Sequence, residues 1–238
     1  MKTQKLIALT ALLALASGAL NAQELGAVTP NVEAGKWAIG GTWSYGEMKL
    51  TDTGCSGSGC DYKVKANHVY VQADWGFTKT WAGYARLGVA DLKDDTAGSG
   101  SKLNLAPFLG VGVNGAVYSS GAFSTGPAIQ LNYFFEESKT NGGFKYTAKS
   151  HWNGSVGWGF EGKWDAVTFY GGPQYYTEEF KPTVSGYGIT VSGDTQKSKG
   201  NLGAYAGARF TPAPNWRINF EANYRGGVGV GLGFAYKF

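Results

Sequence analysis

The sequence has few cysteines, histidines and prolines, and it has no long apolar run after residue 22. It holds two cysteines, two histidines and seven prolines in 238 residues. No clustered zinc ligands, phosphate-binding glycine loop or nucleophile elbow are present. A membrane helix needs ~20 consecutive apolar residues, so any membrane crossing after residue 22 would have to be made by strands.

The chain also lacks a strong charge of either sign. Lys2 and Lys5, an apolar stretch from Leu6 to Leu15 and small residues up to Ala22 are typical of a secretory signal peptide. Removing residues 1–22 takes two lysines from the 21 basic residues and nothing from the 17 acidic ones, which leaves 19 and 17. Because the two charges nearly balance, no nucleic-acid partner is predicted. Residues 23–238 are expected to form one domain.

Glycine and aromatic residues are abundant, with 38 Gly, 14 Tyr, 13 Phe and 8 Trp. Tyr, Phe and Trp favour strands, and glycine marks turns and crowded barrel interiors. The last thirteen residues show the pattern most clearly, because apolar side chains fall on every second position there. These residues are Val228, Val230, Leu232, Phe234, Tyr236 and Phe238. Alternation with a period of two predicts a strand with one apolar face.

The same alternation recurs along the chain and predicts an all-β, antiparallel barrel of ten strands, or of eight if two assignments merge. Long polar loops are expected at 49–66, 92–102 and 181–199, and residues 23–35 are expected to lead into the first strand from the end with short turns. The predicted strands lie near 37–45, 68–77, 81–89, 103–117, 123–138, 146–164, 167–176, 202–210, 216–225 and 226–238.

A soluble β-sandwich would also alternate, because it too buries one apolar face of each strand. Strands of ~9–11 residues or more, aromatic residues near strand ends and alternating long and short connections favour a membrane barrel instead.

The terminal aromatic strand resembles the C-terminal signature of Gram-negative outer-membrane β-barrels, and the whole mature chain is similar to small members such as the opacity-protein-like and porin-like proteins. The resemblance implies a monomer in contact with outer-membrane lipid and lipopolysaccharide, with its long loops on the outside. It also implies that the barrel assembly machinery reads Phe238.

The two cysteines, Cys55 and Cys60, are separated by four small residues. An exported protein meets oxidising conditions, so a disulfide across this short loop is expected. A metal site is the rival interpretation, but only His68 lies nearby in the sequence, and no metal or other cofactor is predicted.

Strand parity places charged residues of both signs on the face that would line the lumen. These residues are Asp74, Arg86, Glu136, Glu161, Arg209, Arg217, Glu221, Arg225 and Lys237. One hypothesis is a narrow channel for small polar or anionic solutes, with Arg209, Arg217 and Lys237 as a basic mouth. The alternative is a barrel filled by paired side chains, which is non-conducting and acts through its external loops.

An enzyme is a remote alternative, and no catalytic residue is predicted. His68 with Asp91, Asp94 or Asp95 would resemble the His and Asp pairs at the rim of outer-membrane proteases, but the closely spaced motifs of that family are absent. His151 is followed by Trp152 and Asn153 where a lipid A deacylase would offer a His and Ser pair. An outer-membrane hydrolase is therefore not favoured.

Overall fold

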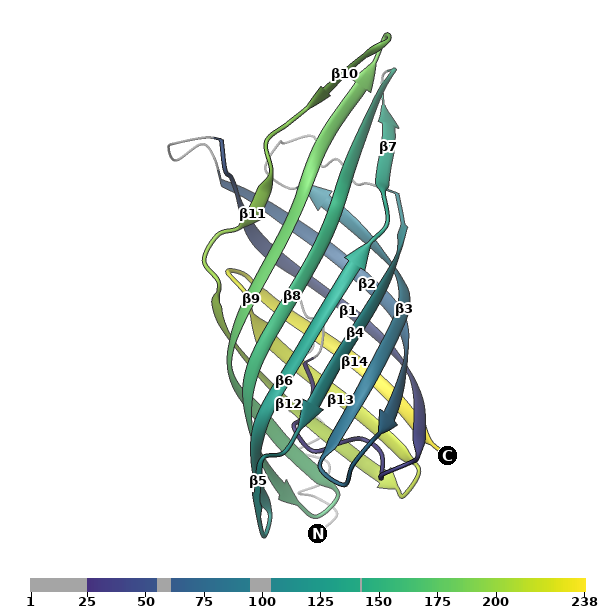
Figure 1. Cartoon of the computed structure of the whole chain (residues 1–238), viewed down its shortest axis with the longest axis vertical. Coiled ribbons are helices and arrows are strands. Elements are labelled where there is room, and N and C mark those ends of the chain that lie inside the picture. The colour runs from purple at the N-terminus through teal and green to yellow at the C-terminus, as the bar shows by residue number, and fades with distance from the viewer. Residues whose placement is uncertain (1–24, 55–60, 95–103, 142) are drawn as a thin grey trace, which may run out of the picture.

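The chain forms a tall antiparallel barrel (Figure 1). The computed structural model describes residues 25–54, 61–94, 104–141 and 143–238. The predicted signal peptide and the predicted pair Cys55 and Cys60 lie outside these ranges. No helix among the described residues is long and apolar enough to cross a membrane.

Fourteen strands lie within the described residues. They are β1 (Trp37–Asp52), β2 (Asp61–Gly76), β3 (Trp81–Asp94), β4 (Ala106–Gly115), β5 (Tyr118–Ser120), β6 (Phe123–Phe134), β7 (Glu137–Asn141), β8 (Phe144–Trp164), β9 (Val167–Gly186), β10 (Ile189–Ser192), β11 (Gln196–Ser198), β12 (Leu202–Ala213), β13 (Trp216–Tyr224) and β14 (Val228–Lys237).

Ten of these strands pair with their neighbours to close a ring, which confirms the predicted all-β antiparallel barrel. The order around the ring is β1, β2, β3, β4, β6, β8, β9, β12, β13, β14 and back to β1. Each ring strand overlaps one of the ten predicted segments. The predicted number therefore describes the closed ring rather than the whole set of strands.

Four short strands extend this ring. β5 pairs with β6, β7 pairs with β8, β10 pairs with β9, and β11 pairs with both β1 and β9. β11 thus links β9 to β1 above the ends of β12, β13 and β14. Much of the polar sequence expected to form loops at 49–66 and 181–199 is strand, because backbone pairing continues beyond the apolar part of the wall.

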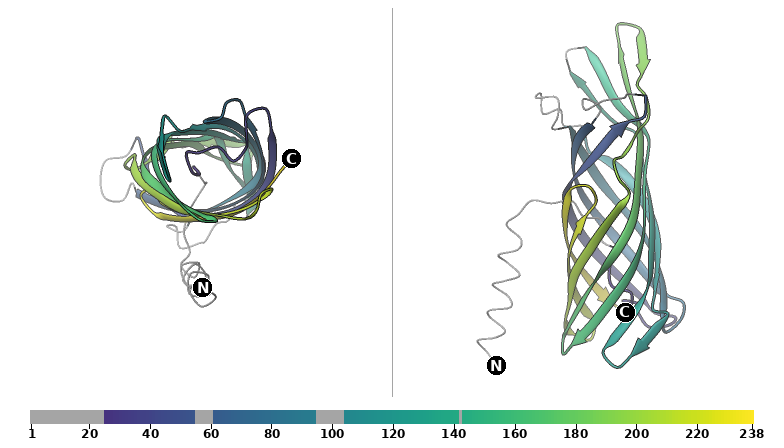
Figure 2. Two further views of the ribbon diagram at one scale, coloured as in Figure 1. Left: turned by 90° about the horizontal axis from the view of Figure 1, so that it is seen from below. Right: turned by 90° about the vertical axis from the view of Figure 1, so that its left-hand side faces the viewer.

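The two ends of the barrel differ in their connections. At the lower end, which holds the C-terminus in Figure 1, short turns join β2 to β3, β8 to β9 and β12 to β13. At the upper end the connections are longer, and β7, β10 and the ends of β8 and β9 rise above the other strands (Figures 1 and 2). The β13–β14 connection at residues 225–227 is a short exception.

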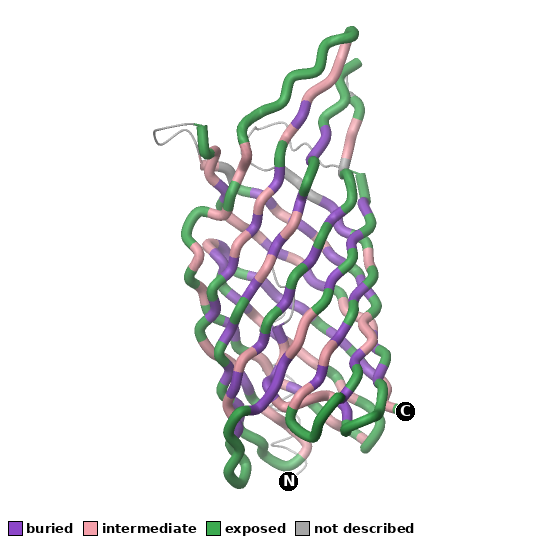
Figure 3. The backbone as a smooth tube through the Cα atoms, in the orientation of Figure 1, coloured by how far each residue is buried: buried purple, intermediate pink, exposed green. Residues whose placement is uncertain are grey.

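The ring strands turn their apolar side chains outward and their polar side chains inward. Buried and exposed positions alternate along them (Figure 3), and on β2, for example, Val69 and Val71 are exposed while His68 and Tyr70 are buried. A soluble sandwich would bury the apolar set. An exposed apolar wall is instead what a membrane barrel presents to lipid.

Aromatic residues gather on the outer wall at the lower end. The Trp37 and Trp75 rings stack with centroids 5.9 Å apart, and Tyr236 contacts Trp216 and Phe238 edge-on, each at 5.1 Å. Rings of this kind form the aromatic girdles that flank the apolar band of a membrane barrel.

Candidate functional site in the barrel lumen

Residues 25–36, called the inner segment below, run from inside the barrel, where residues 25–32 lie, to the lower rim, where residues 33–36 are exposed. The view from below in Figure 2 shows this earliest part of the described chain within the ring of strands. Leu25, Ala27 and Val28 are almost completely buried, and Leu25 packs in a cluster with Tyr170 and Tyr205 on the inner wall. Residues 33–36 lead into β1 from the lower end, as expected, but the prediction did not include the burial of residues 25–32 inside the barrel.

Two buried carboxylates hold the backbone of the inner segment. The Leu25 and Gly26 N–H groups donate to the two carboxylate oxygens of Glu221, at 2.9 and 2.8 Å. The Thr29 N–H donates to Glu161 Oε2 at 3.0 Å. Each of these hydrogen bonds gives a buried backbone amide a partner on the wall, so together the three contacts fix the segment against the wall.

Donors from the wall satisfy the carbonyl groups of the same segment. Asn114 Nδ2 donates to the Ala27 carbonyl at 2.7 Å, and Arg209 Nη1 donates to the Thr29 carbonyl at 3.2 Å. Side chains of the wall thus pair backbone groups of residues 25, 26, 27 and 29, although the inner segment belongs to no sheet along most of its length.

Inward glycines on β8 make room for the inner segment. A Cβ at Gly159 would lie 2.5 Å from Val28 Cγ1 and 2.5 Å from Tyr205 Oη. A Cβ at Gly157 would lie 3.1 Å from Leu25 Cδ1. Any side chain at Gly159 would therefore displace either the segment or the Tyr205 ring.

At the lower rim, Lys237 Nζ donates to Glu33 Oε1 at 2.8 Å. This hydrogen bond from the lysine is the main reason that the pKa of the exposed Glu33 carboxyl is lowered. The rim pair ties the last part of the inner segment to the last strand.

A charged network occupies the middle of the lumen around Arg86. Its Nε donates to Gln72 Oε1 at 2.6 Å, and its Nη1 donates to Gln130 Oε1 at 2.9 Å. The guanidinium also lies over the Tyr70 and Tyr84 rings, 4.9 and 4.5 Å from their centroids. These contacts replace water around a cation that is almost fully buried.

Above this network the lumen is aromatic. The His151 ring stacks on Phe134, with centroids 4.1 Å apart, and its Nε2 lies 2.8 Å from Glu178 Oε1. Phe134 in turn stacks on Phe108 at 5.1 Å, and the His68 ring packs against both phenylalanines at 5.7 Å. Edge-on and offset ring contacts of this kind stabilise the fold by more than the burial of their apolar area alone would give.

A bulge in β8 brings His151 into this stack. Lys149 pairs with Lys181 and Trp152 with Glu179, so two residues of β8 lie opposite Phe180 alone. Because a β-bulge adds one residue, the inward-facing positions are even-numbered before it and odd-numbered after it. Both Ala148 and His151, three residues apart, are therefore buried on the inner face.

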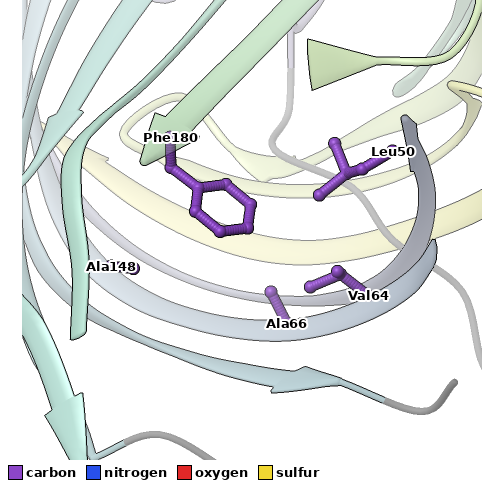
Figure 4. Packing of buried hydrophobic residues seen from close by; sticks show 5 residues of the cluster. All are labelled: Leu50, Val64, Ala66, Ala148 and Phe180. Atoms are coloured by element: carbon purple, nitrogen blue, oxygen red, sulfur yellow. The ribbon is translucent and has the colours of Figure 1, made fainter. Parts of the chain in front are cut away.

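An apolar cluster lies at the upper end of the lumen. We call Leu50, Val64, Ala66, Ala148 and Phe180 the mouth cluster (Figure 4). The Phe180 ring also meets the His151 ring edge-on at 5.6 Å, which joins the mouth cluster to the aromatic stack below it.

The structure separates the nine predicted lumen residues into three groups. Arg217 and Lys237 are partly exposed near the lower rim. Glu136 is exposed and lies in the interruption between β6 and β7, so its placement on the inner face is wrong, because the alternation of β6 ends before it. The other six are buried: Asp74, Arg86, Glu161, Arg209, Glu221 and Arg225.

The structure shows no functional contact for the remaining predicted sites among the described residues. Phe238 is exposed, and its N–H donates to the Trp37 carbonyl at 3.0 Å; its role in assembly stays a prediction. Among the described residues, no group of three or more His, Cys, Asp or Glu side chains could hold a metal ion. Asp91, predicted as a partner of His68 in the remote protease alternative, accepts hydrogen bonds from the backbone and side chain of Asn67.

Three parts of the lumen were not found from the sequence: the inner segment, the pairing of His151 with Glu178, and the mouth cluster. The inward glycines Gly157 and Gly159 were a signal for the first, because two adjacent inward positions without side chains leave room for another part of the chain. Parity placed His151 on the inner face, but the sequence gives no strand register from which its pairing with Glu178 could be predicted.

Comparisons with known proteins agree with the fold. No protein-family model matches the sequence, and no curated protein matches it. The outer membrane protease OmpT from Escherichia coli matches with a TM-score of 0.50 and 10% identity, over 90% of this chain and 100% of that one. The translocator domain of the autotransporter NalP from Neisseria meningitidis gives 0.51 and 13%, over 87% and 90%.

The outer membrane protein AlkL in lipid bilayers gives a TM-score of 0.51 and 12% identity, over 91% of this chain and 96% of that one. At such identities the likeness concerns the fold and not the activity; one of these proteins is a protease and another is a translocator domain. The chain therefore has the fold of the small outer-membrane β-barrel proteins, without resembling one member in particular.

Proposed function

We propose that this protein is an integral outer-membrane β-barrel whose lumen is closed by its own inner segment, so that it is non-conducting at rest. The observation that carries the proposal is the inner segment itself, held by Glu221 and Glu161 between inward-facing side chains. We assign no catalytic activity to it, and we place its work at the upper end.

Three features support this location and orientation. The outer wall of the barrel is apolar and exposed, with aromatic rings at its lower end. The solved structures that it resembles are outer-membrane barrels. Bacterial barrels have short periplasmic turns and longer external loops, so the lower end would face the periplasm and the upper end the exterior.

A narrow anion channel is a second candidate, for a state in which the inner segment has left the lumen. Arg209 and Arg217 lie on strands next to the lower turn between β12 and β13, and Lys237 lies beside them at the end of β14. Cations at one mouth of a pore favour the entry of anions. Release of the inner segment would leave this basic mouth open.

Conductance of the purified protein in planar lipid bilayers tests both candidates. The unmodified protein should be silent. Gly159→Leu, which would clash with Val28, and Glu221→Ala, which removes the acceptor of two backbone amides, should produce steps with anion preference. Gly162→Leu on the same strand is the matched control, because a Cβ there meets nothing within 4 Å, and it should stay silent.

Steady conductance of the unmodified protein, equal to that of the two variants, would show that the inner segment does not close the lumen. Silence of folded variants from which the segment has been released would remove the channel candidate and leave the non-conducting barrel.

A further inference from the structure

The upper part of the barrel carries an amphipathic sheet that the closed lumen does not explain. We call it the blade: β7, β10 and the ends of β8 and β9 beyond the bulge, which rise above the other strands (Figures 1 and 2). Its strands pair in one continuous register, in which Tyr146 lies opposite Val184 and Val184 opposite Val191.

One face of the blade is apolar on β8, β9 and β10 and continues the inner wall of the barrel, while at the β7 edge Lys139 lies opposite Tyr146 on the same face. Tyr146 stands two residues from Ala148, and Val184 stands four residues from Phe180, so both share the face of these two inward residues. Ile189 lies opposite Gly186 on this same face. Tyr146, Ile189 and Val191 are 43%, 66% and 62% exposed, although they are apolar.

The opposite face of the blade is polar and basic. Lys145 lies opposite Ser185, which lies opposite Thr190, and further down Lys149 lies opposite Lys181. The polar face is what a water-exposed surface should look like, but the apolar face is not. Water-exposed surfaces rarely carry a contiguous group of apolar residues unless that group binds something.

The apolar face leads into the mouth cluster and the aromatic stack. Phe180 belongs to the mouth cluster and meets His151, His151 stacks on Phe134, and Phe134 contacts His68. Apolar and aromatic side chains thus line one path from the exposed blade to the interior.

A polar atom lies at the inner end of this path. His68 is 7% exposed, and among the described residues its Nδ1 has no hydrogen-bond partner. A buried ring nitrogen that has lost water and gained no partner is costly, and such atoms in a native structure call for an explanation. A hydrogen-bonding group on a bound molecule would supply that partner.

We propose that the blade, the mouth cluster and the aromatic stack form a binding site for an uncharged aromatic or apolar small molecule with one hydrogen-bonding group. The exposed face of the blade receives the molecule from outside, the mouth cluster gives way through the Phe180 side chain, and His68 Nδ1 pairs with its polar group. This site is independent of the inner segment, which lies at the other end of the lumen.

Equilibrium dialysis of 1-naphthol and of naphthalene against the protein in lipid nanodiscs, with empty nanodiscs subtracted, tests the proposal. Val191→Asp places a charge on the apolar face and should weaken 1-naphthol binding about tenfold, the cost of losing one apolar contact surface. The matched control is Thr190→Asp, which places the same charge on the polar face of the same strand and should change binding less than about twofold.

His68→Phe tests the polar end of the site. The unmodified protein should bind 1-naphthol about fivefold more tightly than naphthalene, as one neutral hydrogen bond provides. His68→Phe, with folding checked by circular dichroism, should remove this preference while retaining naphthalene binding.

Two results would overturn the proposal. One is binding no greater than to empty nanodiscs, and the other is an equal effect of Val191→Asp and Thr190→Asp. A preference for 1-naphthol that survives in His68→Phe would overturn the role given to His68. None of these outcomes depends on conductance, so failure of this site and failure of the closed-lumen proposal are distinguishable.

Discussion

The lower and upper halves of the lumen are occupied by different parts of the chain. The lower half is filled by a separate piece of chain, held by backbone hydrogen bonds to Glu221 and Glu161. The upper half is filled by side chains that belong to the wall strands, such as Phe134 and Phe180. A segment can leave as a unit, whereas a wall side chain can only change its rotamer. Opening from below would thus be all or none, and opening from above would be local.

Of the substitutions that test this difference between the two halves, Glu221→Ala is expected to have the largest effect. It leaves the buried Leu25 and Gly26 amides without an acceptor, at about 1–3 kcal/mol for each amide. Hydrogen exchange should accelerate at these two amides and not in the upper stack. Glu221→Gln keeps one oxygen acceptor and should show a smaller change. Equal protection of the inner segment in all three proteins would contradict its anchoring by Glu221.

A smaller effect is expected for Phe134→Leu in the upper half. The substitution keeps an apolar side chain but removes the ring contacts to His151 and Phe108, worth about 0.5–1.5 kcal/mol each. The free energy of unfolding in denaturant should fall by about 1–3 kcal/mol, while exchange at Leu25 stays unchanged.

Tyr133→Leu is the control for this variant, because Tyr133 is the neighbouring residue on β6 and faces outward. Tyr133→Leu should not change the environment of His151, which can be followed through the ring resonances of His151 in NMR spectra. If Phe134→Leu also loosens the inner segment, the two halves are not independent.

The smallest effect is expected at the lower rim. The lowered pKa of Glu33 means that its pairing with Lys237 stabilises the fold above the ordinary glutamate pKa of about 4.3. This contribution is lost as the pH falls through the lowered value. In Lys237→Met that pH dependence should disappear, as measured by exchange at residues 33–36 between pH 3 and pH 6, about the range that spans the titration. An unchanged pH profile would mean that Lys237 does not hold the segment.

The wall of the barrel was predictable from the sequence and most of its contents were not. Alternation is a local signal, so residues such as Val69 and Val71 identify an outward face without knowledge of any partner. The inner segment has no period, and its main anchor, Glu221, is 196 residues from Leu25 in the chain. Parity placed Glu221 on the inner face, but nothing local indicated that its carboxylate would bind backbone amides.

The same reasoning explains the misplaced Glu136 and the unpredicted inward position of Ala148 in the mouth cluster. Parity is counted from neighbouring residues, and it fails where a strand is interrupted after Phe134 or where it bulges near Ser150. Both irregularities lie where the barrel wall passes into the blade. Ser150 has a φ of 52°, in the left-handed region, and such a residue cannot be recognised from side-chain type alone.

The position of Glu221 also has a consequence for the order in which the molecule is completed. Glu221 lies on β13, the last strand but one of those described, and its carboxylate binds residues that precede the first strand. Leu25 and Gly26 therefore cannot be secured until nearly the whole sheet exists. The seating of the inner segment is a late step that depends on nearly all the others, and a seated segment is therefore itself a mark of a finished barrel.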